Sequence, residues 1–161
     1  MSDIALPAVA GCEPPTVDAS PFLIVRAGAE LYALAGACVR EVARWRAPTP
    51  VPGAPDVIPG VVSQRGVVLP VVDLRLALGL PASLPDRNTR LVVARHDTVD
   101  VALLVDAVVD LTPLAGAMQP PPAGPRDARR TRLLGAVTRH AGCPLGMLDL
   151  GALIAAVQED V

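Results

Sequence analysis

The chain has 161 residues, of which 52% are hydrophobic and 19% charged, and its formal net charge is −2. This composition is too apolar for a disordered chain, and the length suits one ordinary domain or two very small ones. The charge balance provides no global field to attract nucleic acid or an anionic membrane, and one Trp, one Tyr and one Phe are too few for stacking bases.

The three cysteines, Cys12, Cys38 and Cys143, are odd in number and widely spaced, which favours free thiols in a reducing compartment. The longest stretch without a charged residue or histidine, 111–125, holds five prolines and is shorter than the roughly 20 residues of a membrane span. No basic segment precedes the apolar residues at the N-terminus, so a secretory signal is not expected. We therefore expect a cytoplasmic protein.

Residues 1–20 show no sustained period and are read as a flexible leader, with order beginning near residue 21. A β-hairpin is expected next, with its turn centred on Gly28. The first strands are expected at 22–26, 31–35 and 39–45. The proline-rich segment 47–55 is a loop, and residues 56–58 are read as one helical turn.

The segment GVVSQRGVVLPVVDL, residues 60–74, carries the strongest local pattern. Two β-rich runs flank a three-residue turn, in which Gly66 suits the left-handed position and Arg65 stands at the tip in solvent. Asp73 is expected to cap a short helix over residues 74–78, which ends at Gly79.

The rest of the chain again predicts strands and one helix. The expected strands are 90–96, 99–105, 108–111, 133–138 and 144–148. Residues 112–130 are read as a long loop, and an apolar helix is expected at 150–157 after Asp149.

The two halves of the chain resemble each other at a spacing of about 70 residues. Gly60-Val61-Val62-Ser63 parallels Gly135-Ala136-Val137-Thr138, and each is followed by a turn, a strand, an Asp-Leu pair and an apolar helix. Two copies of a small all-strand unit favour a pair of small barrels that pack on one another.

The sequence contains no reactive arrangement that points to catalysis. Phosphate-binding glycine loops and a nucleophile elbow are absent, and His140 with Cys143 has no second pair to complete a zinc site. The basic run 126–132 is read as a solvated loop. We therefore expect no enzyme, no cofactor and no metal, and a protein that binds other proteins.

The segment GVVSQRGVVLPVVDLR, residues 60–75, resembles the signature of the CheW-like coupling proteins of bacterial chemotaxis, in which a Gly-Val, an Arg-Gly turn and a Pro-Val-Val-Asp-Leu-Arg return occur in this order. The opening strand at 22–25, the segment Val39-Arg40-Glu41-Val42, the segment 105–108 and Leu134-Gly135 resemble the family as well. The resemblance covers about residues 22 to 157.

The resemblance implies an all-β fold of two small interlocked five-stranded barrels, an SH3/OB-like duplication with short helices and a C-terminal helix. The domain is expected at 21–161, with the first barrel at about 21–80, the second at 88–149 and the helix at 150–158. The implied function is a non-catalytic scaffold that ties the cytoplasmic tip of a chemoreceptor to the regulatory domain of a CheA-type histidine kinase.

Six positions match receptor-contacting residues of the family: Val39, Glu41, Gly60, Arg65, Val108 and Leu111. The kinase contact is implied at barrel edges, without residues that can be assigned to it. The residues themselves also allow structural roles. Arg65 and Glu41 could simply face solvent, and Val39, Val108 and Leu111 could be core residues. Gly60 could serve only the backbone conformation at the start of a strand.

The chain departs from the family pattern at Ser63-Gln64, where an Asn usually precedes the Arg-Gly turn. The departures leave open an adaptor of a related pilus or developmental pathway. A double barrel that binds single-stranded nucleic acid is a further alternative.

Overall fold

The computed structural model describes residues 21–121 and 128–159. The expected leader and residues 126 and 127, the first two of the basic run, lie outside these residues. The first half contains β1 (Phe22–Ala27), β2 (Glu30–Ala35), the 3-10 helix η2 (Gly36–Cys38), β3 (Val39–Arg44), β4 (Gly60–Gln64), β5 (Val67–Asp73) and α1 (Leu74–Ala77). The second half contains β6 (Arg90–His96), β7 (Val99–Val105), β8 (Ala107–Thr112), α2 (Ala128–Arg132), β9 (Leu134–His140), β10 (Cys143–Leu148) and α3 (Leu150–Glu159).

Every expected strand is present, and most boundaries agree within two residues. Two local expectations were wrong. Residues 56 and 57 lie in a turn rather than in a helical turn, and α2 occupies the end of the expected loop. The 3-10 helix η2 lies between two expected strands, where no element was predicted. The alanine and arginines of α2 favour a helix once the proline-rich part of the loop has ended.

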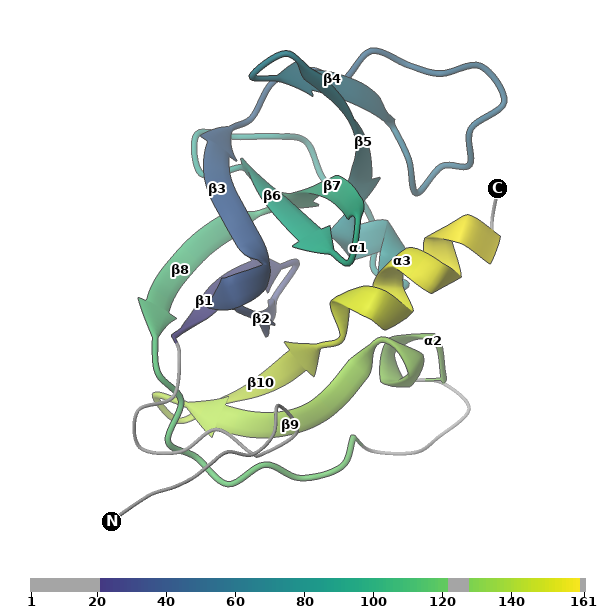
Figure 1. Ribbon diagram of the computed structural model, residues 1–161. Coiled ribbons are helices and arrows are strands. Elements are labelled where there is room, and N and C mark those ends of the chain that lie inside the picture. The colour runs from purple at the N-terminus through teal and green to yellow at the C-terminus, as the bar shows by residue number, and fades with distance from the viewer. Residues whose placement is uncertain (1–20, 122–127, 160–161) are drawn as a thin grey trace.

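The ten described strands form two five-stranded sheets, one with the order β8-β1-β2-β10-β9 and the other β3-β6-β7-β5-β4 (Figure 1). This corrects the expected division into a barrel at 21–80 and a barrel at 88–149. The hairpin β1–β2 joins the last three strands of the second half, and the hairpin β6–β7 joins the last three of the first. Local patterns specify hairpins but not their distant partners, so the exchange could not be read from the strands alone.

The sheet orders confirm the internal repeat. The strands β1 to β5 correspond, in order, to β6 to β10. When every strand is exchanged for its counterpart, the order of one sheet becomes the order of the other. The one parallel pair in each sheet follows the same rule, because β10 pairs with β2 and β5 pairs with β7. The halves are therefore interlocked copies of one unit.

The turns between β4 and β5 and between β9 and β10 also match. Gln64 pairs with Val67, so the turn has two residues, Arg65 and Gly66, rather than the expected three. Both have positive φ, 53° and 80°, which is the pattern of a type I′ turn. Ala141 and Gly142 repeat it, with φ of 51° and 81°.

The largest apolar core lies between the two sheets and not inside either barrel. It includes residues of β1, β2, β6 and β7 and the apolar faces of α1 and α3, which lie between the sheets (Figure 1). Smaller clusters fill each barrel, around Leu91 and Leu104 in one and around Ile24 and Leu145 in the other. Neither of these clusters is large, so packing between the barrels fixes how their edge strands lie relative to each other.

Candidate functional site

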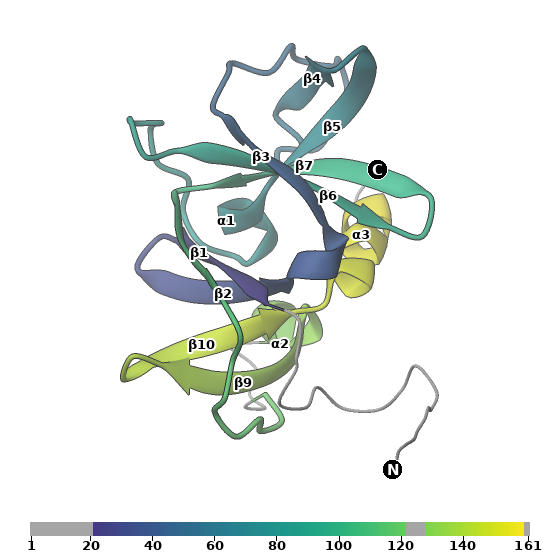
Figure 2. The ribbon, with the colours of Figure 1, turned by 60° about the vertical axis from the view of Figure 1, so that its left-hand side comes forward.

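Two equivalent edge strands, β3 and β8, border the junction of the barrels. Each is one of the two edge strands of its sheet, and both views place them on the same side of the molecule (Figures 1 and 2). Val39 and Val108 occupy equivalent positions on these strands, and both are partly buried against the core between the sheets. The two valines therefore lie at the inner border of a shared surface.

A β-bulge separates the roles of Val39 and Glu41. In a regular strand, residues two apart share a face. Here Val39 pairs with Ala94 and Glu41 with Val93, which are neighbours in β6, so Val39 and Glu41 lie on opposite faces. Val39 thus packs on the core between the sheets, while Glu41 reaches the turn at Arg65. The same register shift occurs in β8, where Val108 pairs with Val25 and Asp110 with Ile24.

The outer parts of both edge strands expose apolar side chains. Leu111, one of the expected site residues, is 59% exposed, and its counterpart Val42 is 41% exposed. Their strand neighbours, Leu23 and Val92, are buried in the core between the sheets. Sequence reasoning missed Val42, although the repeat that aligns β3 with β8 was the signal that could have found it.

The polar part of the site is a hydrogen-bonded chain, here called the clasp, formed by Glu41, Gln64, Arg65 and Arg46. Arg65 Nε donates to Glu41 Oε1 at 3.0 Å, and Gln64 Nε2 donates to Glu41 Oε2 at 2.9 Å. Arg46 Nη2 donates to Gln64 Oε1 at 2.7 Å. The clasp joins the two edges of one sheet, β3 and β4, and it brings together two of the expected site residues.

The clasp leaves most of the Arg65 guanidinium free. Its side chain is 79% exposed, whereas that of Glu41 is 27% exposed. Because only Nε contacts Glu41, the terminal nitrogens of Arg65 point a positive charge into solvent from a rigid turn. Glu41 acts here as a support for Arg65 rather than as a freely solvated carboxylate.

The hydrogen bond from Arg65, with its charge, holds the pKa of Glu41 below the usual range of a glutamate. A carboxylate whose pKa is depressed in the folded state stabilises the clasp above its ordinary pKa, and this stabilisation is lost as the pH falls through the folded value. We expect Arg65→Gln to raise the pKa of Glu41, as measured by NMR titration of the carboxyl carbon. An unchanged titration in the variant would show that Arg65 does not hold Glu41 in solution.

The barrel formed by the sheet β8-β1-β2-β10-β9 carries a weaker counterpart of the clasp. His140 Nε2 lies 3.8 Å from Asp110 Oδ2, at the positions equivalent to Gln64 and Glu41. The equivalent turn has Ala141 in place of Arg65. Of the two hairpin tips, only the one between β4 and β5 therefore presents a guanidinium.

Gly60 is buried, whereas Glu41 is partly exposed and Arg65 is exposed. A Cβ at this position would collide with the carbonyl oxygen of Thr49 and lie 2.6 Å from its carbonyl carbon. Thr49 and Val61 exchange backbone hydrogen bonds at 2.8 and 2.9 Å, which hold the proline-rich loop against β4. Gly60 thus serves the close approach of two backbones behind the Arg65 hairpin.

A buried ion cluster anchors the other end of β5. Arg75 lies between Asp73 and Asp106, with Nε–Oδ1 and Nη1–Oδ1 distances of 3.0 and 2.8 Å. Asp106 also accepts from the backbone N–H of Gly28. The hydrogen bond that Arg75 donates to Asp73 is the main cause of a raised Arg75 pKa, so the guanidinium stays charged. The cluster ties β5 and α1 to the end of β7 and to the β1–β2 turn.

Among the residues that the structure describes, no group of three or more His, Cys, Asp or Glu side chains is placed to hold a metal ion. Within the same residues, no helix is long and apolar enough to cross a membrane.

Comparison with known proteins gives consistent results. The family model for the CheW-like domain matches residues 21–158. The chain is 35% identical to "Chemotaxis protein CheW" of Rhizobium meliloti (strain 1021) over 111 residues, which cover 68% of this chain and 72% of the relative. It is 38% identical to "Protein FrzA" of Myxococcus xanthus over 101 residues, 62% of each chain.

A solved structure shares the fold. The crystal structure of scaffolding protein TtCheW from Thermoanaerobacter tengcongensis superposes with a TM-score of 0.75 at 24% identity, covering 83% of this chain and 91% of that one. The match of the family model to nearly all of the described residues, together with these relatives, shows that this chain belongs to the CheW-like family.

Proposed function

We propose that this protein is a non-catalytic scaffold of a chemotaxis-type pathway. In this role it holds the cytoplasmic tip of a chemoreceptor to the regulatory domain of a CheA-type histidine kinase, acting in the cytoplasm and at membrane receptor arrays. Membership of the CheW-like family supports the role. The observation that carries the proposal is the surface on which β3 and β8 expose apolar residues beside a guanidinium held by the clasp.

The surface suits a helical partner. Val39, Val42, Val108 and Leu111 provide apolar contact for one face of a receptor helix. The free nitrogens of Arg65 can bind receptor carboxylates or the carbonyl groups at a helix C-terminus. Gly60 contributes by keeping the hairpin in place and not by direct contact.

A second candidate is the same coupling role in a related pilus or developmental pathway. It is retained because a relative of comparable identity carries a name other than CheW. The two candidates differ in which receptor and kinase of the cell the protein binds, and co-sedimentation with each receptor–kinase pair distinguishes them.

We expect Arg65→Glu to weaken binding of a purified receptor cytoplasmic fragment by at least about tenfold, because the variant reverses the charge that faces the partner and places it beside Glu41. Isothermal titration provides the measurement. The matched control is Ala141→Glu, which places the same carboxylate at the equivalent turn of the other barrel. Unchanged affinity for Arg65→Glu, or equal losses for the two variants, would contradict the proposal.

A further inference from the structure

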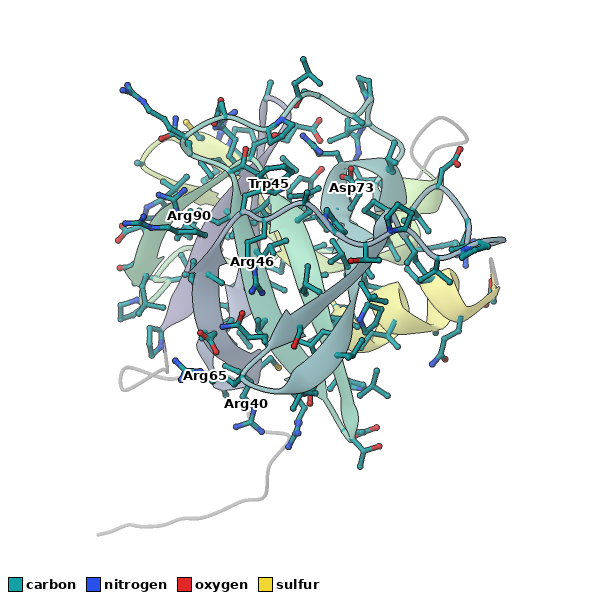
Figure 3. The ribbon with its side chains drawn as sticks, turned by 90° about the horizontal axis from the view of Figure 1, so that it is seen from above. Arg40, Trp45, Arg46, Arg65, Asp73 and Arg90 are labelled. Carbon is teal, nitrogen blue, oxygen red and sulfur yellow. The ribbon has the colours of Figure 1, made fainter. Side chains whose placement is uncertain are left out.

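A second charged surface lies beyond the end of β3, away from the Arg65 hairpin. A hollow of about 350 Å³ opens between β3 and the segment before β6. It is here called the arginine site and is lined by Arg44, Trp45, Asp86, Arg87, Thr89 and Arg90. Figure 3, seen from above, shows Trp45 and Arg90 toward one end of this face and Arg40 and Arg65 toward the other.

Two arginines of the site lie side by side on neighbouring strands. Arg44 of β3 pairs in register with Arg90 of β6, so their side chains project from the same face. Like charges in directly opposite positions repel each other. Across the residues that the structure describes, no carboxylate forms an ion pair with Arg44, Arg87 or Arg90. The hollow therefore holds three arginines against one carboxylate, that of Asp86, which forms no ion pair with them in the described residues.

The local structure holds the arginine site in shape. Arg90 Nη1 donates to the carbonyl oxygens of Arg87 and Thr89 at 2.7 and 2.9 Å, which fixes the guanidinium and leaves its other nitrogens available. The backbone N–H of Asp86 donates to Thr89 Oγ1 at 2.8 Å, and Asp86 Oδ1 accepts from the backbone N–H of Asn88 at 2.7 Å. Asp86 thus shapes the turn, and one of its oxygens is engaged by the backbone.

Trp45 adds an apolar wall to the site. Its ring is partly buried against the core inside the barrel, which limits its motion, and it also lines the hollow. A tryptophan between arginines offers a flat apolar surface together with one N–H donor. The site can therefore contact the apolar portion of a ligand as well as its charges.

The shape of the charged surface favours an extended ligand. Arg46 follows Trp45 directly and enters the clasp with Gln64, so positive side chains continue from the arginine site to Arg65. The donors that line the hollow are guanidinium and indole side chains spread over two strands and a turn. Such a row matches carboxylates spaced along a chain better than a single compact anion.

We propose that the arginine site binds an acidic segment, rich in Asp and Glu, of a partner protein, with carboxylates on Arg44 and Arg90 and an apolar group across Trp45. The proposal uses residues separate from the receptor surface and does not depend on the proposed coupling role. It gives the barrel formed by the sheet β3-β6-β7-β5-β4 a second point of attachment.

Trp45 is the one tryptophan in the chain, so its fluorescence reports directly on the site. The experiment titrates the full chain with an octaglutamate peptide and, in parallel, with octaglutamine, inorganic phosphate and oligothymidine. We expect saturable change in Trp45 emission with octaglutamate, weakened by added salt. Arg44→Gln with Arg90→Gln should lower this affinity by at least about tenfold.

The control double variant, Arg95→Gln with Arg139→Gln, removes the same charge from outside the site and should leave the affinity within about twofold. Circular dichroism checks that both variants are folded, and binding of the receptor fragment should be retained in both. Equal losses in the two double variants, equal binding of octaglutamine, or no Trp45 response would overturn the proposal. Tighter binding of phosphate or oligothymidine than of octaglutamate would also overturn it, in favour of an anion or nucleic-acid site.

Discussion

Replacing Arg75 by methionine should lower the free energy of unfolding by about 3–5 kcal/mol, because removing one partner of a buried ion cluster leaves uncompensated charge behind. The Arg75 side chain is 3% exposed, and those of Asp73 and Asp106 are 6% and 10% exposed. Without the guanidinium, both carboxylates lose their shared counter-charge. Urea denaturation followed by circular dichroism measures the effect.

The matched control for Arg75 is Arg95, which also forms a bidentate pair with an aspartate. Arg95 contacts Asp100 at 2.7 and 2.9 Å, but its side chain is 45% exposed. Arg95→Met should therefore change the stability little, because water replaces the lost contact. Arg75→Lys, which keeps the charge but not the planar fork, should fall between the two. Equal stability of Arg75→Met and Arg95→Met would show that the cluster does not hold the barrels together.

Short-range features of this fold could be predicted from the sequence because neighbouring residues specify them. Asp73 accepts hydrogen bonds from the backbone N–H groups of Arg75 and Leu76, as a helix cap should, and Asp149 accepts one from Ala152. The hairpin turning at residues 97 and 98 has the expected strand limits. In each case, a turn or cap residue and the alternation beside it were enough.

Long-range features could not be predicted, because a strand pattern fixes which face is apolar but not which distant strand pairs with it. The ion pair between Glu41 and Arg65 joins residues 24 apart, and the one between Arg75 and Asp106 joins residues 31 apart. The bulge between Val39 and Glu41 also puts these two residues on opposite faces of β3, whereas residues two apart in a regular strand share a face. The arginine site depends in the same way on the register of Arg44 with Arg90.

The paired glycines of the repeat give a second large expected effect. Gly60→Ala should destabilise the fold by about 1–3 kcal/mol, because the added methyl group meets the backbone of Thr49, which has no flexible end to move aside. Gly135, its counterpart in the repeat, has open space where a Cβ would stand. Gly135→Ala should be neutral or slightly stabilising, since alanine restricts the unfolded chain more than glycine does.

Amide hydrogen exchange locates the damage from Gly60→Ala. The N–H groups of Thr49 and Val61 donate to each other's carbonyl oxygens, so their protection should fall more than that of amides in β6 and β7. Because the Arg65 hairpin begins at Gly60, the variant should also weaken receptor binding, whereas Gly135→Ala should not. Retained protection of both amides and unchanged binding would mean that Gly60 neither holds the loop against β4 nor supports receptor binding.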